Sequence, residues 1–126
     1  MEDYIVNTMV GGDAATKIRF LNAYNNADSL NNHMNETLLI SDVFIVKGQR
    51  KSYYGGEVSE CYNTYLIGAS GDCYFTQSNG VAKSVMMIVA NFPDFGKDSY
   101  EGGLRVRCIE KTINNGNRMK TLELVM

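Results

Sequence analysis

Basic and aromatic residues gather in one short stretch of this chain, between Lys47 and Tyr65. The basic residues there are Lys47, Arg50 and Lys51, and the aromatic residues are Tyr53, Tyr54, Tyr62 and Tyr65. In sites for single-stranded nucleic acid, cations contact the phosphates and flat rings stack on unpaired bases. The stretch therefore predicts a surface for a single strand. Each ring also has an alternative role, which is to pack against neighbouring strands in the core.

Two arginines outside the stretch are candidates to lengthen this surface. Arg19 lies in the first predicted strand, and Arg118 lies beside the last predicted hairpin. The tyrosines also limit the surface, because residues at an odd spacing in a strand point to opposite faces. Tyr62 and Tyr65 are three residues apart in one predicted strand. We expect at most one of these two rings to face the ligand.

No set of residues suited to catalysis or to metal binding stands out. His33 is the only histidine and lies in an Asn-rich segment, where no Ser-His-Asp or Cys-His set can be assembled. Cys61, Cys73 and Cys108 are far apart and form no C-x-x-C pair, so we expect three half-buried, reduced thiols. The sequence predicts a protein that is not an enzyme and that uses no metal or other cofactor.

Length and charge set further bounds. The 126 residues suit one domain, expected over 15–126 after a flexible lead-in at 1–14. The net charge of −2 disfavours coating of duplex DNA through a global basic field. A local basic groove is still allowed, because at about 0.15 M salt charges beyond about 8 Å are largely screened. No run approaches the ~20 apolar residues of a membrane span, and no signal pattern opens the chain. We expect a cytoplasmic protein with no membrane partner.

The elements that must hold these residues are mostly strands. Alternating or two-sided apolar runs predict five main strands, at 16–24, 38–47, 58–67, 104–113 and 118–125. A turn at 69–72 leads to a short hairpin partner at 73–76, and Asn114–Asn117 joins the last two strands. Helical spacing over 81–91, with Ser78 or Asn79 as the cap and Pro93 beyond the end, predicts one helix. The remaining segments, 25–36, 48–56 and 93–103, are predicted as loops, and Asp42 marks a bulge or an open edge.

This order of elements predicts an all-β protein with one helix. We interpret it as an OB-like (oligonucleotide-binding) five-stranded antiparallel barrel with a small extra hairpin strand and an α-helix between the third and fourth main strands. The second and third strands of such a barrel, with their loops, usually form the ligand surface. Lys47–Tyr65 falls in that place, so composition and fold indicate the same surface. Other small β proteins with a single helix could share the order.

A family resemblance adds to this interpretation. The segments that carry it are Thr16-Lys17-Ile18, Asn22-Ala23, Leu38–Val46, Thr64-Tyr65-Leu66, Gly71, Tyr74, Ser78 and the hairpin from Asn115-Gly116 to Leu124. With these segments the chain resembles the small single-stranded DNA-binding proteins of tailed phages of Gram-positive bacteria, in particular the protein-primed Bacillus podoviruses. The resemblance covers roughly 15–125 through the order of elements and scattered identities. The loops at 25–35 and 93–103 depart most from it.

The resemblance implies a protein with an OB fold that coats single-stranded DNA during replication and has no catalytic activity. In that role the chain would act in the cytoplasm of the host cell. Its partners would be single-stranded DNA, with replication proteins and further copies of the chain as additional candidates. The alternative is a small phage-encoded protein-interaction module or an inhibitor of a host factor, which the pI of about 5.3 and the polar loops favour.

Overall fold

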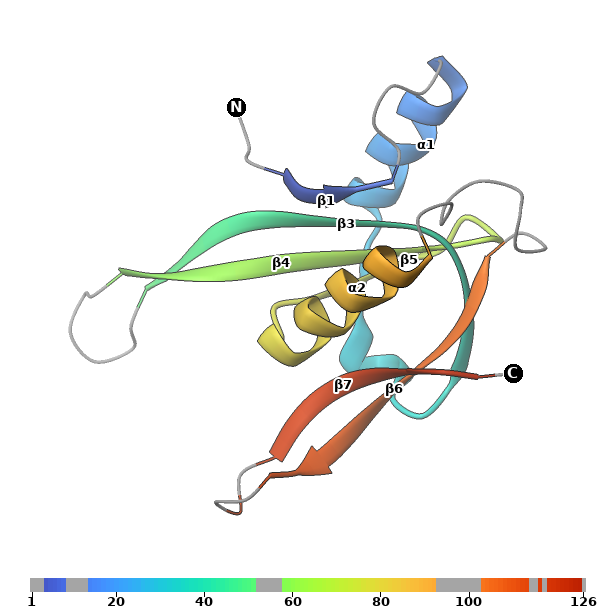
Figure 1. Ribbon diagram of the computed structural model, residues 1–126. Helices are drawn as coiled ribbons and strands as arrows, with labels where there is room; N and C mark the ends of the chain where they lie inside the picture. Colours follow the sequence, from blue (N-terminus) through green and yellow to red (C-terminus); the bar gives the residue numbers. More distant parts are fainter. Residues whose placement is uncertain are drawn as a thin grey trace.

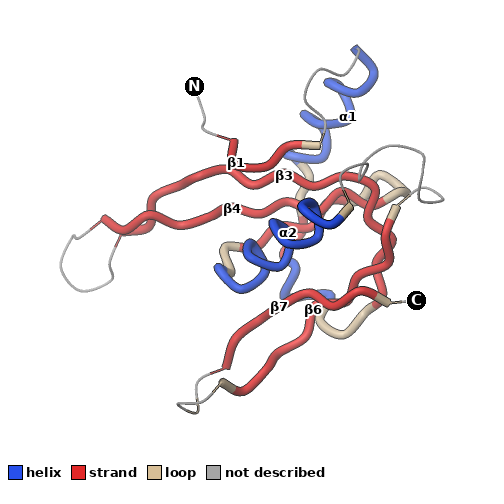
Figure 2. The backbone as a smooth tube through the Cα atoms, viewed as in Figure 1, coloured by secondary structure: helices blue, strands red, loops and turns tan. Residues whose placement is uncertain are grey.

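The long strand β3 (Thr37–Lys51) is the centre of a curled sheet, shown in Figure 1 and, by secondary structure, in Figure 2. This computed structural model describes residues 4–8, 14–51, 58–92, 103–113, 116 and 118–125. Strand β3 was predicted over 38–47 from apolar residues on both sides, and the prediction is confirmed. Val43 and Ile45 enter one core, whereas Phe44 and Val46 enter a second core on the opposite face. The sheet is therefore buried on both faces around β3.

Within the described residues, six further strands belong to the sheet around β3. They are β1 (Tyr4–Asn7), β2 (Asp28–Ser29), β4 (Val58–Gly68), β5 (Cys73–Thr76), β6 (Leu104–Thr112) and β7 (Arg118–Leu124). The order is β2-β5-β4-β3-β6-β7, and β1 pairs with β3 beyond β6. Only β2 and β5 run parallel among these pairs, so the sheet is mixed. The predicted strands from 38 onward are confirmed, as is the β6–β7 hairpin.

The sheet curls because two strands, β6 and β1, pair with different parts of the same edge of β3. Its start at Thr37–Ile40 pairs with β6, and its middle at Phe44–Val46 pairs with β1. Its other edge pairs with β4 from Ile40 to Lys51. The register shifts between Ile40 and Asp42, which agrees with a bulge, one of the two alternatives predicted for Asp42. A bulge bends the strand and increases its twist, so β3 can serve two partners on one edge.

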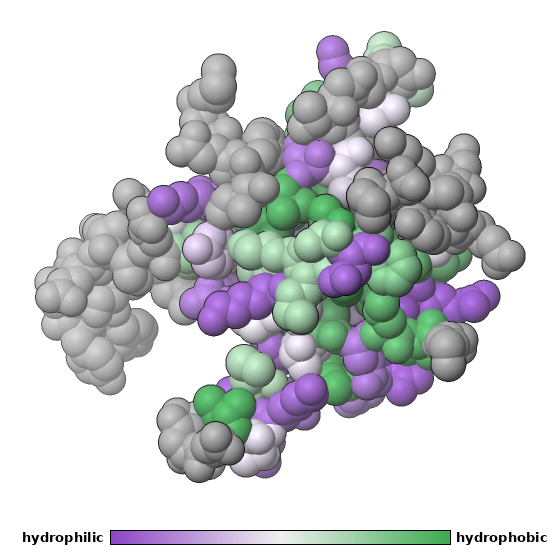
Figure 3. Space-filling model, in the orientation of Figure 1, coloured by the Kyte–Doolittle hydropathy of each residue, from purple (hydrophilic) through white to green (hydrophobic). Residues whose placement is uncertain are grey.

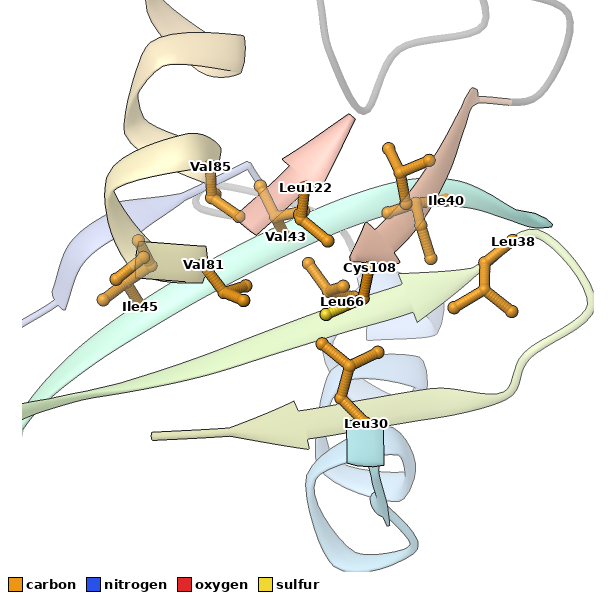
Figure 4. Packing of buried hydrophobic residues seen from close by; sticks show 12 residues of the cluster. Leu30, Leu38, Ile40, Val43, Ile45, Leu66, Val81, Val85, Cys108 and Leu122 are labelled. Carbon is orange, nitrogen blue, oxygen red and sulfur yellow. The ribbon is translucent and has the colours of Figure 1, made fainter. Parts of the chain in front are cut away.

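Helix α2 (Asn79–Asn91) confirms the predicted helix. The Ser78 hydroxyl accepts a hydrogen bond from the backbone N–H of Val81 at 3.3 Å, and Phe92 ends the helix one residue before Pro93. Val81 and Val85 are buried among side chains of the strands, as Figure 4 shows around Leu66 and Leu122. Helix α2 therefore closes the core on the concave side of the curled sheet.

The strand predicted at 16–24 is wrong, because Ala14–Asn25 forms helix α1. The apolar residues Phe20, Ala23 and Tyr24 have the i, i+3, i+4 spacing of one helix face. Ala23 is buried against the second core, and Phe20 packs on Phe44 with 4.6 Å between ring centroids. Ile18 and Leu21 are exposed on the other side, so the apolar pattern is weak and resembles a poor strand. Neither helix within the described ranges is long and apolar enough to span a membrane.

Two further segments also carry more structure than predicted. The lead-in at 1–14 contains β1, whose backbone pairs with β3. The loop at 25–36 contains β2 and a 3-10 helix, η1 (Leu30–His33), anchored by the buried Leu30. These elements have two to four residues each, too few to show a periodic pattern. The protein is therefore mostly β with two α-helices and a curled mixed sheet consistent with an OB-like fold. Its strand count, its parallel β2–β5 pair and the positions of its helices differ from the predicted antiparallel barrel with one helix.

His33 fixes η1 through two carboxylates. Its Nε2 lies 2.7 Å from Asp28 Oδ2, and its Nδ1 lies 3.1 Å from Glu36 Oε2. Both ring nitrogens face acceptors, and this arrangement favours the doubly protonated, cationic ring. The hydrogen bond to Asp28 raises the pKa of His33 against the opposing effect of partial burial, and Glu36 adds to the rise. The only histidine thus connects β2 to the segment that precedes β3.

Candidate nucleic-acid interface

One basic residue and one tyrosine of the predicted surface lie side by side on the sheet. Lys47 of β3 is directly opposite Tyr62 of β4 in the antiparallel register, so both point to the same face. That face carries α2, because Tyr62 packs against the core of Val81 and Ile45. Lys47 is exposed and Tyr62 is partly buried. The pair therefore places a cation beside an aromatic ring on the α2 side of the β3–β4 hairpin.

The two other basic residues of the stretch, Arg50 and Lys51, lie in strand β3 and not in a loop. The segment 48–56 was predicted as a connection, but β3 extends to Lys51 and β4 begins at Val58. The backbones of Arg50 and Lys51 pair with Ser59 and Val58. Cross-strand pairing therefore continues as far as Lys51 and Val58, and 52–57 lie outside the described residues. Tyr53 and Tyr54 lie outside the described residues, so their contact with bases stays a prediction.

Tyr65 is part of the core on the opposite face. Its ring stacks on Phe44 with 4.5 Å between centroids and 12° between planes, and only 8% of the residue is exposed. Tyr62 and Tyr65 therefore face opposite sides of β4, as their spacing predicted. In this arrangement the Tyr65 ring has no free face on which a base could stack. Its position is that of a structural residue.

The guanidinium group of Arg19 forms hydrogen bonds within the protein. It extends from α1, and its Nη1 donates to Asp42 Oδ2 at 3.0 Å, while Nη2 donates to Ser41 Oγ and to the Gly68 carbonyl. Burial raises the pKa of Asp42, and the hydrogen bonds from Thr8 and Arg19 work against that rise. A buried carboxylate needs such partners. Arg19 therefore holds α1 against the bulge of β3, and not on the predicted first strand of a groove.

Arg118 opens β7 on the other long hairpin. Its side chain is 76% exposed and lies 3.5 Å from Glu110, a distance at which a surface pair contributes little. In Figure 1 the β3–β4 hairpin and the β6–β7 hairpin project to the same side of the molecule. The structure therefore brings Lys47 and Tyr62 together, sets Arg118 on the second hairpin, and leaves Arg19 and Tyr65 with the opposite core.

Tyr24 is an aromatic residue that the sequence analysis did not select. It stacks on Tyr65 with 5.2 Å between ring centroids, and 40% of it is exposed. The ring of Phe75 contacts Tyr65 from β5. Tyr24 is thus the outer ring of an aromatic cluster under α1. Its helical spacing from Phe20 was the signal that could have placed it there.

The cysteines and acids give no metal site within the described ranges, where no suitable group of His, Cys, Asp and Glu occurs. Cys61, Cys73 and Cys108 are buried free thiols, as predicted except that their burial is more complete. Burial raises the pKa of Cys73 to about 11, so its thiol stays protonated at neutral pH and is a poor nucleophile.

Comparison with known proteins decides the family. The model of the phage single-stranded DNA-binding protein family matches residues 2–125. The chain belongs to this family. No curated protein and no solved structure matched it. The match confirms the resemblance that the order of elements and the scattered identities indicated, and it also covers β1, which lies before the segment of that resemblance.

Proposed function

We propose that the chain is a non-enzymatic protein that coats and protects single-stranded DNA during replication of a phage or mobile element, in the cytoplasm of the host cell. The observation that carries this proposal is the family match over residues 2–125. The exposed Lys47 beside Tyr62 supports it, because a cation and a ring on one face suit a phosphate and its base. Replication proteins and further copies of the chain are candidate additional partners.

The arrangement of strands supports an OB-type binding mode. If β3 is the first strand of the barrel, α2 falls between the third strand, β5, and the fourth, β6. The sequence analysis took 16–24 as the first barrel strand and β5 as an extra hairpin strand. In the present numbering the first barrel strand is β3, and β5 is the third. OB barrels bind oligonucleotides with the loops after the first and the fourth strands. In this chain those connections fall at 52–57 and 114–117. Arg118 directly follows the second, and Lys47 lies five residues before the first.

In the proposed mechanism, bases stack on tyrosines and phosphates contact the neighbouring cations. Tyr62 is the described ring for this role, with Tyr53 and Tyr54 as the predicted rings of the connection. Lys47, Arg50, Lys51 and Arg118 are the proposed phosphate contacts. Because the protein as a whole carries −2, attraction is local to these hairpins and falls steeply with salt.

Titration with oligo-dT, followed by tyrosine fluorescence at low and at high salt, tests the proposal. Bases that stack on tyrosine quench its emission, so we expect quenching that saturates at low salt and a lower affinity at high salt. A duplex of the same length is the control and is expected to bind more weakly. No binding of oligo-dT at low salt would remove the proposal.

A protein-interaction module remains the second candidate, and one surface feature favours it. An apolar hollow of about 630 Å³ lies between α2 and β7, lined by Met87, Ile88, Phe92 and Leu124 among others. Met87 is 67% exposed, and Figure 3 shows apolar side chains gathered over α2 and β7. Exposed apolar patches often mark protein contacts. A protein partner that binds the nucleic-acid-free chain, with no binding of oligo-dT, would favour this second function.

A further inference from the structure

Two adjoining hollows form a groove across the beginning of α2. One, of about 420 Å³, lies between β5 and β7, and the other, of about 390 Å³, lies between α2 and the β6–β7 hairpin. Both are lined by Ser78, Asn79 and Lys120, so they adjoin at these residues. We call this surface the α2 groove and define it by these three residues with Lys83 and Arg118. The sequence analysis did not select Lys83 or Lys120.

The walls of the α2 groove are held together backbone to backbone. A Cβ atom at Gly80 would lie 2.0 Å from the Lys120 carbonyl oxygen, so only glycine lets α2 approach β7 this closely. One turn later, Ser84 Oγ lies 2.6 Å from Thr121 Oγ1 and accepts a hydrogen bond from the Leu122 N–H at 3.2 Å. These contacts fix the first turns of α2 against β7. The cations on the two elements therefore have a defined spacing.

The α2 groove is positive in an acidic protein. Among the described residues that line it, three are cations and one, Glu110, is an acid. Within the part of the chain that the structure describes, Lys83 and Lys120 form no ion pair with a carboxylate. Lys120 Nζ donates instead to the neutral side-chain oxygen of Asn31. A concave, polar surface with excess positive charge suits an extended anion better than an apolar ligand.

We propose that the α2 groove carries the sugar–phosphate backbone of the single strand whose bases stack at Tyr62. The inference rests on the proposed function and deepens it by assigning the path of the phosphates. Lys47 and Tyr62 lie on the face of the sheet that carries α2. In Figure 1 the beginning of α2 lies between the two projecting hairpins. A strand held between the hairpins therefore crosses Lys83 and Lys120.

The test is the salt dependence of oligo-dT binding by the double variant Lys83→Gln/Lys120→Gln. Each phosphate contact on a single strand contributes about 0.7 to the slope of log affinity against log salt, so the slope is expected to fall by about 1.4. The matched control is Lys17→Gln/Arg105→Gln, two exposed cations on α1 and at the base of the β6–β7 hairpin. Both variants lose two positive charges and carry −4 instead of −2. Thermal melts establish that both variants are folded.

The outcomes separate the α2 groove from the proposed function. A smaller slope in the groove variant with an unchanged slope in the control supports the phosphate path. Wild-type binding with an unchanged slope in the groove variant overturns it, and so does an equal fall in both variants, which would report net charge alone. If the wild-type chain does not bind oligo-dT, the proposed function fails and this inference fails with it.

Discussion

Replacing Tyr65 with alanine is expected to lower the free energy of unfolding by about 3–5 kcal/mol, the range for removing a large aromatic ring from a core. The ring stacks on Phe44 and contacts Tyr24 and Phe75, so its loss leaves a cavity between α1 and the sheet. Phe44 on the neighbouring strand is completely buried, so its ring loses the stacking contact with Tyr65 inside the core. Urea unfolding, followed by far-ultraviolet circular dichroism, measures the loss.

Tyr62→Ala is the matched control for this prediction, because it removes the same side chain three residues away on the same strand. Tyr62 is only partly buried, so its removal should cost clearly less stability than that of Tyr65. The assignment of Tyr65 to the core would be wrong if Tyr65→Ala unfolded at the same urea concentration as the wild type and bound oligo-dT more weakly.

The second large effect concerns binding. Tyr62→Ala is expected to weaken oligo-dT binding by about 5- to 150-fold, since stacking of one base on an aromatic ring contributes about 1–3 kcal/mol. The structural reason is the position of Tyr62 opposite the exposed Lys47, where one nucleotide can contact a ring with its base and an ammonium group with its phosphate. Affinity is measured by anisotropy of a labelled oligonucleotide, which does not depend on the emission of the tyrosine that is removed.

Tyr62→Phe keeps the ring and separates stacking from other roles. Stacking uses the face of the ring, so this variant should bind within a few-fold of the wild type. If Tyr62→Phe lost as much affinity as Tyr62→Ala, the hydroxyl and not the stacked ring would be the important group. Unchanged affinity in both variants would exclude Tyr62 from the interface.

Much of the sheet could be predicted because its central strands have strong local patterns. The two-sided apolar run of β3, the alternation in β4 and the Asn115-Gly116 turn before β7 each specify one local structure. Ser78 and the helical spacing after it specified α2 in the same way. Local signal and final structure agree wherever the element has enough residues to show its period.

The elements before β3 could not be predicted because tertiary contacts determine them. Helix α1 buries only Ala23 and exposes Ile18 and Leu21, so its sequence has little amphipathic pattern. Its position depends on Arg19, whose partner Asp42 is 23 residues away and is buried beside the register shift of β3. No local pattern in 14–25 contains that information.

The candidate site was predictable in part for the same reason. The spacing of Tyr62 and Tyr65 gave the rule that they face opposite sides, but the choice between the sides depends on where α1 and α2 pack. Lys83 and Lys120 are 37 residues apart and meet only because Gly80 lets α2 lie against β7. A composition argument finds clusters along the chain, whereas the α2 groove is a cluster in space.

Photo-crosslinking of an oligonucleotide that carries iododeoxyuridine, with mapping of the modified peptides, tests most directly where the single strand lies. Iodouracil reacts with aromatic side chains on which it stacks. We predict adducts in the β3–β4 hairpin, at Tyr62 or at the neighbouring Tyr53 and Tyr54. Adducts confined to Tyr24 on α1, on the opposite face of the sheet, would contradict binding between the two hairpins.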